Sequence, residues 1–322
     1  METKIKTILE CAIKAPSGHN TQPWKFKVMD HTIEILPDYS RRLPVVDADD
    51  HALFISLGCA LENLLIAAHQ FDWETKVSFH LEHPGKERIV VSLEKGVPIN
   101  QDGLFESIPI RQSTRNEYDG KTIPEEDWNK IKKAALQEDV NVLVFNAPEE
   151  IKSITPFVKE GAISQFENKE FLKELMHWIR FNESKAEKTR DGLSSKVSGN
   201  PSVPEWLGKI FMGLSISPEK EAHKYEELIL NSSGLMLFIA ERNDKKAWIN
   251  VGRSFERAML QATALGVHHA HMNMPCEEVP VRKKLAAYLK LKDGMEPMLL
   301  IRLGYSEKMP YSFRRPLEEV LV

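Results

Sequence analysis

Apolar residues recur at helical spacing at the start of the chain, and further on they alternate at strand spacing. One stripe in the first fifteen residues consists of Ile5, Ile8, Leu9, Ala12 and Ile13. This spacing predicts a helix over residues 2–15, which Pro16 ends. Residues 24–28 and 32–36 then predict a pair of strands across a turn at 29–31.

The rest of the chain alternates between longer helical patterns and short apolar runs. The predicted elements are a long apolar helix at 51–70, strands at 76–80 and 89–93, a helix beginning at Pro124, a strand at 141–145, a mixed helical region at 149–188, a strand at 235–240, a helix at 248–265, a strand at 267–272, a helix at 279–289 and a strand at 297–305. Residues 190–218 are rich in Ser, Gly and Pro and predict an irregular segment. Because irregular stretches of this length usually form lids or binding loops, we expect a lid over about 161–218.

Two helical segments resemble each other at a constant offset of 194 residues. Residues 58–68 align with 252–262, so that Gly58 matches Gly252 and Glu62 matches Glu256. Two amphipathic helices can also match by chance, but the shared Gly and Glu favour a duplicated unit. We therefore expect two degenerate repeats of one unit, residues 1–100 and 101–322.

Composition narrows the class of protein. The chain has 322 residues, of which 42% are hydrophobic, and a formal net charge of −4. This balance gives no general basic field, so neither nucleic acid nor an anionic membrane surface is an expected partner. Its three cysteines, widely spaced and odd in number, support neither a disulfide framework nor a zinc site. We expect a cytoplasmic protein without a signal peptide or an apolar run long enough to span a membrane.

Candidate chemistry lies in two short motifs, one in each half. Residues 16–24 read Pro-Ser-Gly-His-Asn-Thr-Gln-Pro-Trp, and residues 111–115 read Arg-Gln-Ser-Thr-Arg. The first offers backbone N–H groups, short side-chain donors and a glycine that a planar ligand could approach. The second can present two guanidinium groups and hydroxyl donors to a phosphate or an anionic ring. Each half lacks the other's motif, so we expect one shared site.

Together, these motifs and the tail Arg-Arg-Pro-Leu-Glu-Glu-Val at 314–320 resemble the FMN-dependent nitroreductase family, in particular its long branch of two units fused in one chain. In ordinary members the arginine turn comes from one subunit and the Pro-Ser loop from its partner. The resemblance therefore implies an α+β fold in which the two repeats form an intramolecular pseudo-dimer of mixed sheets flanked by helices. It also implies one FMN per chain, at the pseudo-dimer interface, with NADH or NADPH as reductant. It further implies hydride transfer through flavin N5 to a small nitroaromatic or quinone-like acceptor, with no catalytic residue of the protein's own.

The resemblance also implies roles for individual residues. The expected cofactor-binding set is Pro16, Ser17, Gly18, Asn20, Arg111, Gln112, Ser113, Arg115, Asn273, Arg314 and Arg315. Arg111 and Ser113 would hold the phosphate or ribityl chain, and Arg115 would stabilise negative charge on the reduced ring as an electrostatic group. Arg314 or Arg315 would approach the phosphate, and the family pattern of a basic residue two places before the proline selects Arg314. Gly18 and Ser312 stand where family members often carry a hydroxyl and a basic residue.

Several alternatives remain open from sequence. His268, His269 and His271 could suggest a metal, since His269 and His271 would share one face of a strand. No third metal ligand follows at a suitable spacing, so we expect no metal site. Asp47, Asp49, Asp50 and His51 fit the cap of a helix better than a cation site. The chain could act alone as a monomeric pseudo-dimer or form a homodimer. Its function could instead be flavin binding or sequestration with little turnover, or its site could have decayed; the acceptor and the choice of NADH or NADPH stay open.

Overall fold

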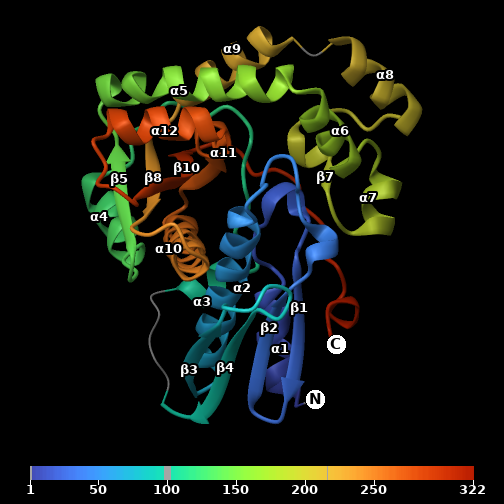
Figure 1. The fold of residues 1–322 in the computed structure, drawn as a ribbon, viewed down its shortest axis with the longest axis vertical. Coiled ribbons are helices and arrows are strands. Elements are labelled where there is room, and N and C mark those ends of the chain that lie inside the picture. Colours follow the sequence, from blue (N-terminus) through green and yellow to red (C-terminus); the bar gives the residue numbers. More distant parts are fainter. Residues whose placement is uncertain (1, 98–102, 216) are drawn as a thin grey trace.

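Two four-stranded sheets and the helices packed on them make up the fold (Figure 1). The computed structural model describes residues 2–97, 103–215 and 217–322. The predicted boundary between the two repeats, at residues 100 and 101, lies outside the described residues. The division into 1–100 and 101–322 therefore stays a prediction, although each sheet is built from one side of that boundary.

The first sheet belongs to the N-terminal part of the chain. Its strands, in spatial order, are β1 (Trp24–Met29), β2 (Thr32–Pro37), β4 (Arg88–Lys95) and β3 (Trp73–His80). Alternate residues such as Ile33, Ile35, Ile89 and Val91 are buried, which is the pattern of strands with one covered face. Helices α1 (Thr3–Ala12) and α2 (His51–Gln70) contribute to the same hydrophobic cluster.

The second sheet lies deeper and is covered on both faces. Its strands, in spatial order, are β5 (Val140–Phe145), β8 (Gly234–Ala240), β10 (Glu296–Gly304) and β9 (His268–His271). Every residue of β8 is buried. Met236 and Phe238 pack with α4 (Glu125–Ala134) and α10 (Lys245–Ala264). Leu235 and Leu237 pack in a separate cluster with the other helices, α5 (Pro148–Glu167), α9 (Pro218–Leu230), α11 (Met274–Glu277) and α12 (Val279–Tyr288).

The expectation of mixed sheets was wrong for these two sheets, in which every strand pair is antiparallel. Among the described residues, parallel pairing is confined to β6 (Ile179–Arg180) with β7 (Leu193–Ser194) and to isolated bridges. Strand direction depends on long-range connections, which local alternation does not encode. The α+β class itself is confirmed.

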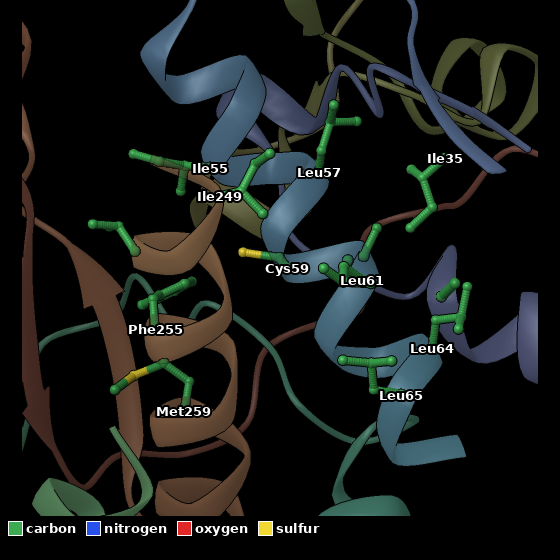
Figure 2. Packing of buried hydrophobic residues seen from close by; sticks show 14 of the residues in the cluster. Ile35, Ile55, Leu57, Cys59, Leu61, Leu64, Leu65, Ile249, Phe255 and Met259 are labelled. Carbon is green, nitrogen blue, oxygen red and sulfur yellow. The ribbon is translucent and has the colours of Figure 1, made fainter. Parts of the chain in front are cut away.

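Helices α2 and α10 cross at two glycines related by the predicted offset. A Cβ on Gly58 would lie 2.0 Å from the Ile249 carbonyl oxygen, and one on Gly252 would lie 1.9 Å from that of Ile55. Ile55 and Ile249 differ by the same 194 residues, so the contact is reciprocal, as in a two-fold interface. Figure 2 shows Ile55, Ile249 and Cys59 where the helices meet. The geometry supports the duplication of these two helices.

Residues 161–218 are more ordered than their composition predicts. They contain α6 (Lys169–Trp178), α7 (Glu183–Thr189) and α8 (Glu205–Ser215) besides β6 and β7. The expectation of an irregular segment over 190–218 was therefore wrong for residues 205–215. Residues 190–204 contain only β7 and one 3₁₀ turn, η3 (Lys196–Ser198). The remaining short elements are α3 (Leu104–Ser107), η1 (Gly18–Asn20), η2 (Tyr39–Arg41) and η4 (Leu317–Glu319).

The C-terminal tail returns to the first sheet. The backbone N–H of Phe26 donates to the Val320 carbonyl at 2.7 Å, and that of Val322 donates to the Phe26 carbonyl at 3.0 Å. Both ends of the chain accordingly lie at the same end of the molecule (Figure 1). The tail extends the edge of β1 and brings residues 314–315 to the Pro-Ser loop.

Helix α2 is long and apolar enough to cross a membrane by composition, contrary to the expectation that no such stretch exists. Its residues are almost all buried inside the fold, which is typical of a core helix. The Asp47 carboxylate accepts hydrogen bonds from the N–H groups of Ala52 and Leu53, both at 2.9 Å. A capping role for this acidic run is thereby confirmed at Asp47.

Candidate functional site

The Pro-Ser loop turns sharply between α1 and β1. The Ser17 hydroxyl accepts a hydrogen bond from the Gln22 N–H at 2.9 Å. His19, Asn20 and Gln22 all have positive φ, at 48°, 55° and 53°. Residues other than glycine rarely adopt this backbone conformation, and those that do are concentrated at functional sites. The surrounding structure therefore holds this loop in a specific shape.

The Arg-Gln-Ser-Thr-Arg turn lies against α10 and β9. The Arg111 side chain is buried, with its Nε 3.1 Å from Oε1 of Glu256, which is fully buried. Its Nη1 lies 3.5 Å from Nε2 of His269. Ser113 forms a parallel bridge with His269, and the Thr114 N–H donates to the His269 carbonyl at 2.8 Å. This pairing fixes the turn at the edge of the second sheet.

The two motifs and the tail meet at the last turn before Pro16. The Lys14 carbonyl oxygen accepts from Nη2 of Arg111 at 3.4 Å and from Nη2 of Arg314 at 3.1 Å. Nη1 of Arg314 also donates to Oδ1 of Asn20 at 3.1 Å. Sequence segments far apart in the chain thus present two guanidinium groups beside one asparagine.

Arg115 lies near His19 of the Pro-Ser loop and near His271 of β9. Burial and the Arg115 charge lower the pKa of His19 to about 4 and that of His271 to about 3. Both imidazoles are therefore neutral at pH 7, while Arg115 keeps its charge in an enclosed environment. The Arg115 Nη1 donates to the Val197 carbonyl at 3.4 Å.

Two of the predicted site residues use their side chains elsewhere. The Gln112 amide pairs with the backbone of Met309, donating at 3.0 Å and accepting at 2.8 Å. Oδ1 of Asn273 accepts from the Leu300 N–H at 3.0 Å, and its Nδ2 donates to Glu277 at 3.2 Å. The Gln112 amide joins the arginine turn to the C-terminal tail, and the Asn273 amide joins its loop to β10. Sequence spacing does not reveal these structural roles.

Arg315 differs from its neighbour Arg314 in direction. Its Nη2 donates to the Glu319 carbonyl at 3.0 Å, and its Nη1 lies 3.9 Å from Asp38. Arg314 instead faces Asn20 and Lys14. Of the two arginine side chains, Arg314, which the family pattern selects, is the one brought to the other motifs.

A segment from the expected lid contacts the Pro-Ser loop. Gly192 and Asn20 exchange two hydrogen bonds, from the Gly192 N–H at 3.2 Å and from the Asn20 amide at 3.1 Å. The Gln22 amide donates to the Arg190 carbonyl at 2.8 Å and accepts from the Arg315 N–H at 2.8 Å. Gln22 therefore supports the loop, and residues 190–192 contact it.

Sequence reasoning missed some members of this site. Glu256 appeared only as part of the repeat, and its pairing with Arg111 needed the tertiary contact. Lys14, Gly192 and Val197 take part through backbone atoms, so their residue types do not indicate a role in the site. Tyr225, on α9, lies near enough to Arg115 for their charges to interact; its phenol gave no motif.

Possible metal ligands also occur in the described residues. Asp47, Asp49 and His51 place ligand atoms within 4.8 Å of one another. Nδ1 of His51 lies 3.0 Å from Asp47 and 2.5 Å from Asp49, so the imidazole already bridges the two carboxylates. His269 is buried in β9, where burial holds its pKa well below its usual range.

Comparison with known proteins shows which protein family the chain resembles. Residues 2–44, which include the Pro-Ser loop, match the model of the nitroreductase family. The relative named "Putative NAD(P)H nitroreductase Rv3131" from Mycobacterium tuberculosis is 25% identical over 98% of this chain and 90% of its own length. Another, "Putative NAD(P)H nitroreductase acg" from the same organism, is 20% identical over 98% of this chain and 94% of its own.

Solved structures give weaker matches. A nitroreductase with bound FMN from Bacteroides fragilis superposes with a TM-score of 0.41 and 16% identity, over 66% of this chain and 93% of that one. The family model over residues 2–44, the full-length relatives and the motifs that meet in the structure all support the nitroreductase family for this chain.

Proposed function

We propose that the chain binds one FMN where the Pro-Ser loop, the Arg111–Arg115 turn and Arg314 meet, and that it is an NAD(P)H-dependent oxidoreductase of the nitroreductase type. The observation that carries this proposal is the convergence of Arg111 and Arg314 on the Lys14 carbonyl beside Asn20. The named relatives, putative NAD(P)H nitroreductases, support the same reaction class.

The donor set fits a phosphate. Arg111 and Arg314 donate to the same carbonyl oxygen, so two like charges are held close together. Burial and the neighbouring Arg111 charge accordingly lower the pKa of Arg314. Nε of Arg314 is buried and has no hydrogen-bond partner among the described residues. A bound phosphate would relieve the repulsion and accept from these guanidinium groups. Glu256 balances part of the charge on Arg111, so Arg314 would supply most of the net attraction.

The other end of the site fits the ring of the cofactor. When bound, FMN supplies the hydride-accepting and hydride-donating chemistry. Arg115 would stabilise negative charge there, because His19 and His271 beside it are neutral and solvent screening is limited. Asn20 would contribute polar contacts from the opposite loop. The chain would need no acid or base of its own if solvent supplies the proton.

The mirror-related position supports one FMN per chain. Glu62 corresponds to Glu256 under the offset of 194 residues. Its carboxylate pairs with Arg253 at 3.0 Å and Arg257 at 2.7 Å, both from α10. Neither the Pro-Ser loop nor the arginine turn has a counterpart there. We infer that this half of the pseudo-dimer interface holds an ion cluster in place of a second cofactor.

The expected acceptor is a small nitroaromatic or quinone-like molecule, reduced by NADH or NADPH. Cys59 and Cys276 are buried free thiols, which suits a reducing cytoplasm. A single chain supplies both sides of the site, so we expect the monomer to be active, with a homodimer as the alternative.

A visible spectrum of the purified protein, recorded before and after addition of reduced nicotinamide, tests the proposal. We expect a flavin spectrum that bleaches with NADH or NADPH and recovers with a quinone. Tight FMN binding without reduction by either nicotinamide would instead support flavin sequestration. A colourless chain that does not bind added FMN would contradict both functions. The double variant Arg111→Ala with Arg115→Ala should lose the cofactor.

A further inference from the structure

A small cavity lies across β9 from the arginines. It has a volume of about 90 Å³ and is lined by Ile110, Thr263 and Val267, together with Gln112, His268 and Lys308. Adjacent strand residues point to opposite faces, so His269 faces Arg111 while His268 faces this cavity. The cavity is therefore separate from the site described above.

The lining combines an apolar wall with one cationic group. Ile110, Val267 and the Thr263 methyl supply the apolar surface. Burial and the nearby Lys308 ammonium lower the pKa of His268, so its ring is neutral at pH 7 and can exchange hydrogen bonds. Among the described residues, no carboxylate lies within ion-pair distance of Lys308.

The position of Lys308 at the cavity is fixed by its neighbour in the chain. The Gln112 amide holds both the N–H and the carbonyl of Met309. On the other side, Nδ1 of His268 lies 3.3 Å from the hydroxyl of Ser306. These contacts hold residues 306–309 along β9, so the lysine lies at the rim of a formed cavity.

We propose that this cavity binds a compact organic carboxylate, with its apolar body against Ile110 and Val267 and its carboxylate at Lys308 and His268. Apolar cavities of about 150 Å³ accept a benzene ring, so the smaller volume here favours a branched body of a few carbon atoms. A neutral ligand would leave the lysine without a partner, and a cationic ligand would be repelled.

Isobutyrate is the probe, added to the full-length protein with labelled methyl groups. We expect saturable shifts at the Ile110 and Val267 methyls, and calorimetry should give a dissociation constant. Lys308→Gln should weaken binding roughly fivefold, the size expected for a partly exposed ion pair. Lys283→Gln, an exposed lysine on α12, should bind as the wild type does. Thr263→Leu should fill the cavity and abolish binding.

Other ligands make the result decisive. Isobutyramide should bind more weakly than isobutyrate, and isobutylamine should not bind. Equal affinity for the amide or the amine would overturn the proposal, as would equal binding of inorganic phosphate. The titration repeated with excess FMN should be unchanged, because loss of binding would place the cavity within the cofactor site. A melting curve for each variant checks folding. Because Lys308 is exposed, Lys308→Gln should fold normally and tests the proposal even if Thr263→Leu does not fold.

Discussion

Arg111 and Arg314 donate to the same acceptor, the carbonyl oxygen of Lys14, at 3.4 Å and 3.1 Å. One arginine follows the boundary between the predicted repeats, and the other belongs to the tail that returns to the first sheet. Two cationic side chains this close are unfavourable unless an anion joins them. This relationship is the main reason to expect a phosphate-bearing cofactor at this position.

Replacing Arg314 should weaken FMN binding far more than replacing Arg315. Arg314→Ala removes charged hydrogen-bond donors worth about 1.5–3 kcal/mol, or roughly 10- to 100-fold in the dissociation constant. Arg315→Ala is the matched control, because its side chain faces Asp38 and Glu319. Fluorescence quenching of FMN measures both constants. Equal losses for the two variants would contradict the assignment.

Glu256→Gln should destabilise the fold more than Glu62→Gln. Glu256 and Arg111 are both buried, and leaving a buried charge unpaired costs about 3–5 kcal/mol. Glu62 is equally buried, but its partners Arg253 and Arg257 are partly exposed and can turn to solvent. Denaturant unfolding at pH 7 measures both free energies. A larger loss of unfolding free energy from Glu62→Gln would contradict the prediction that the Glu256–Arg111 pair contributes more to stability.

Gly58→Ala and Gly252→Ala should each force α2 and α10 apart. An added Cβ would lie within about 2 Å of a backbone carbonyl in either case, so the helices must shift. Overpacking of this kind costs about 1–3 kcal/mol or more. Since either change separates the same contact, the double variant should lose less than the sum. Strict additivity in thermal or denaturant unfolding would argue against one shared crossing point.

Stability should fall as the pH drops from 7 to 5, in part because of His271. Its folded pKa of about 3 lies below the ordinary value of 6.5, so the unfolded chain binds more protons in this range. The contribution is complete above pH 6.5 and is lost as the pH falls toward the folded pKa. His271→Gln should reduce the loss between pH 7 and pH 5 by about 2 kcal/mol. An identical pH dependence in the variant would refute this role.

Asp191→Asn should loosen the segment over the Pro-Ser loop. Oδ1 of Asp191 accepts from Nη2 of Arg180 at 2.7 Å, and its other oxygen pairs with Arg41. Loss of this carboxylate leaves two arginines without their partner, so residues 190–197 should open more often. We expect faster proteolysis there and faster FMN exchange. Glu183→Gln, which removes an exposed pair with Lys196, should change neither rate.

Local pattern predicted most elements because their burial is periodic. The stripe of Ile5, Ile8 and Leu9 is fully or almost fully buried, and α2 occupies residues 51–70 as expected. The offset between Gly58 and Gly252 was also readable in sequence, since close helix contact requires glycine at both positions. Helix α8 was missed because the Ser, Gly and Pro content around it outweighed its own apolar spacing.

The sequence by itself determined which residue types were available for the site: a Pro-Ser loop, an arginine turn and an arginine-rich tail. Only the tertiary structure decided that Arg314 and Arg111 share one acceptor, and that Gln112 and Asn273 serve the backbone. Motif spacing fixes neighbours within a few residues. Which distant groups meet depends on how the tail crosses the sheet and how α2 packs on α10, and many residues outside the motifs set that geometry together.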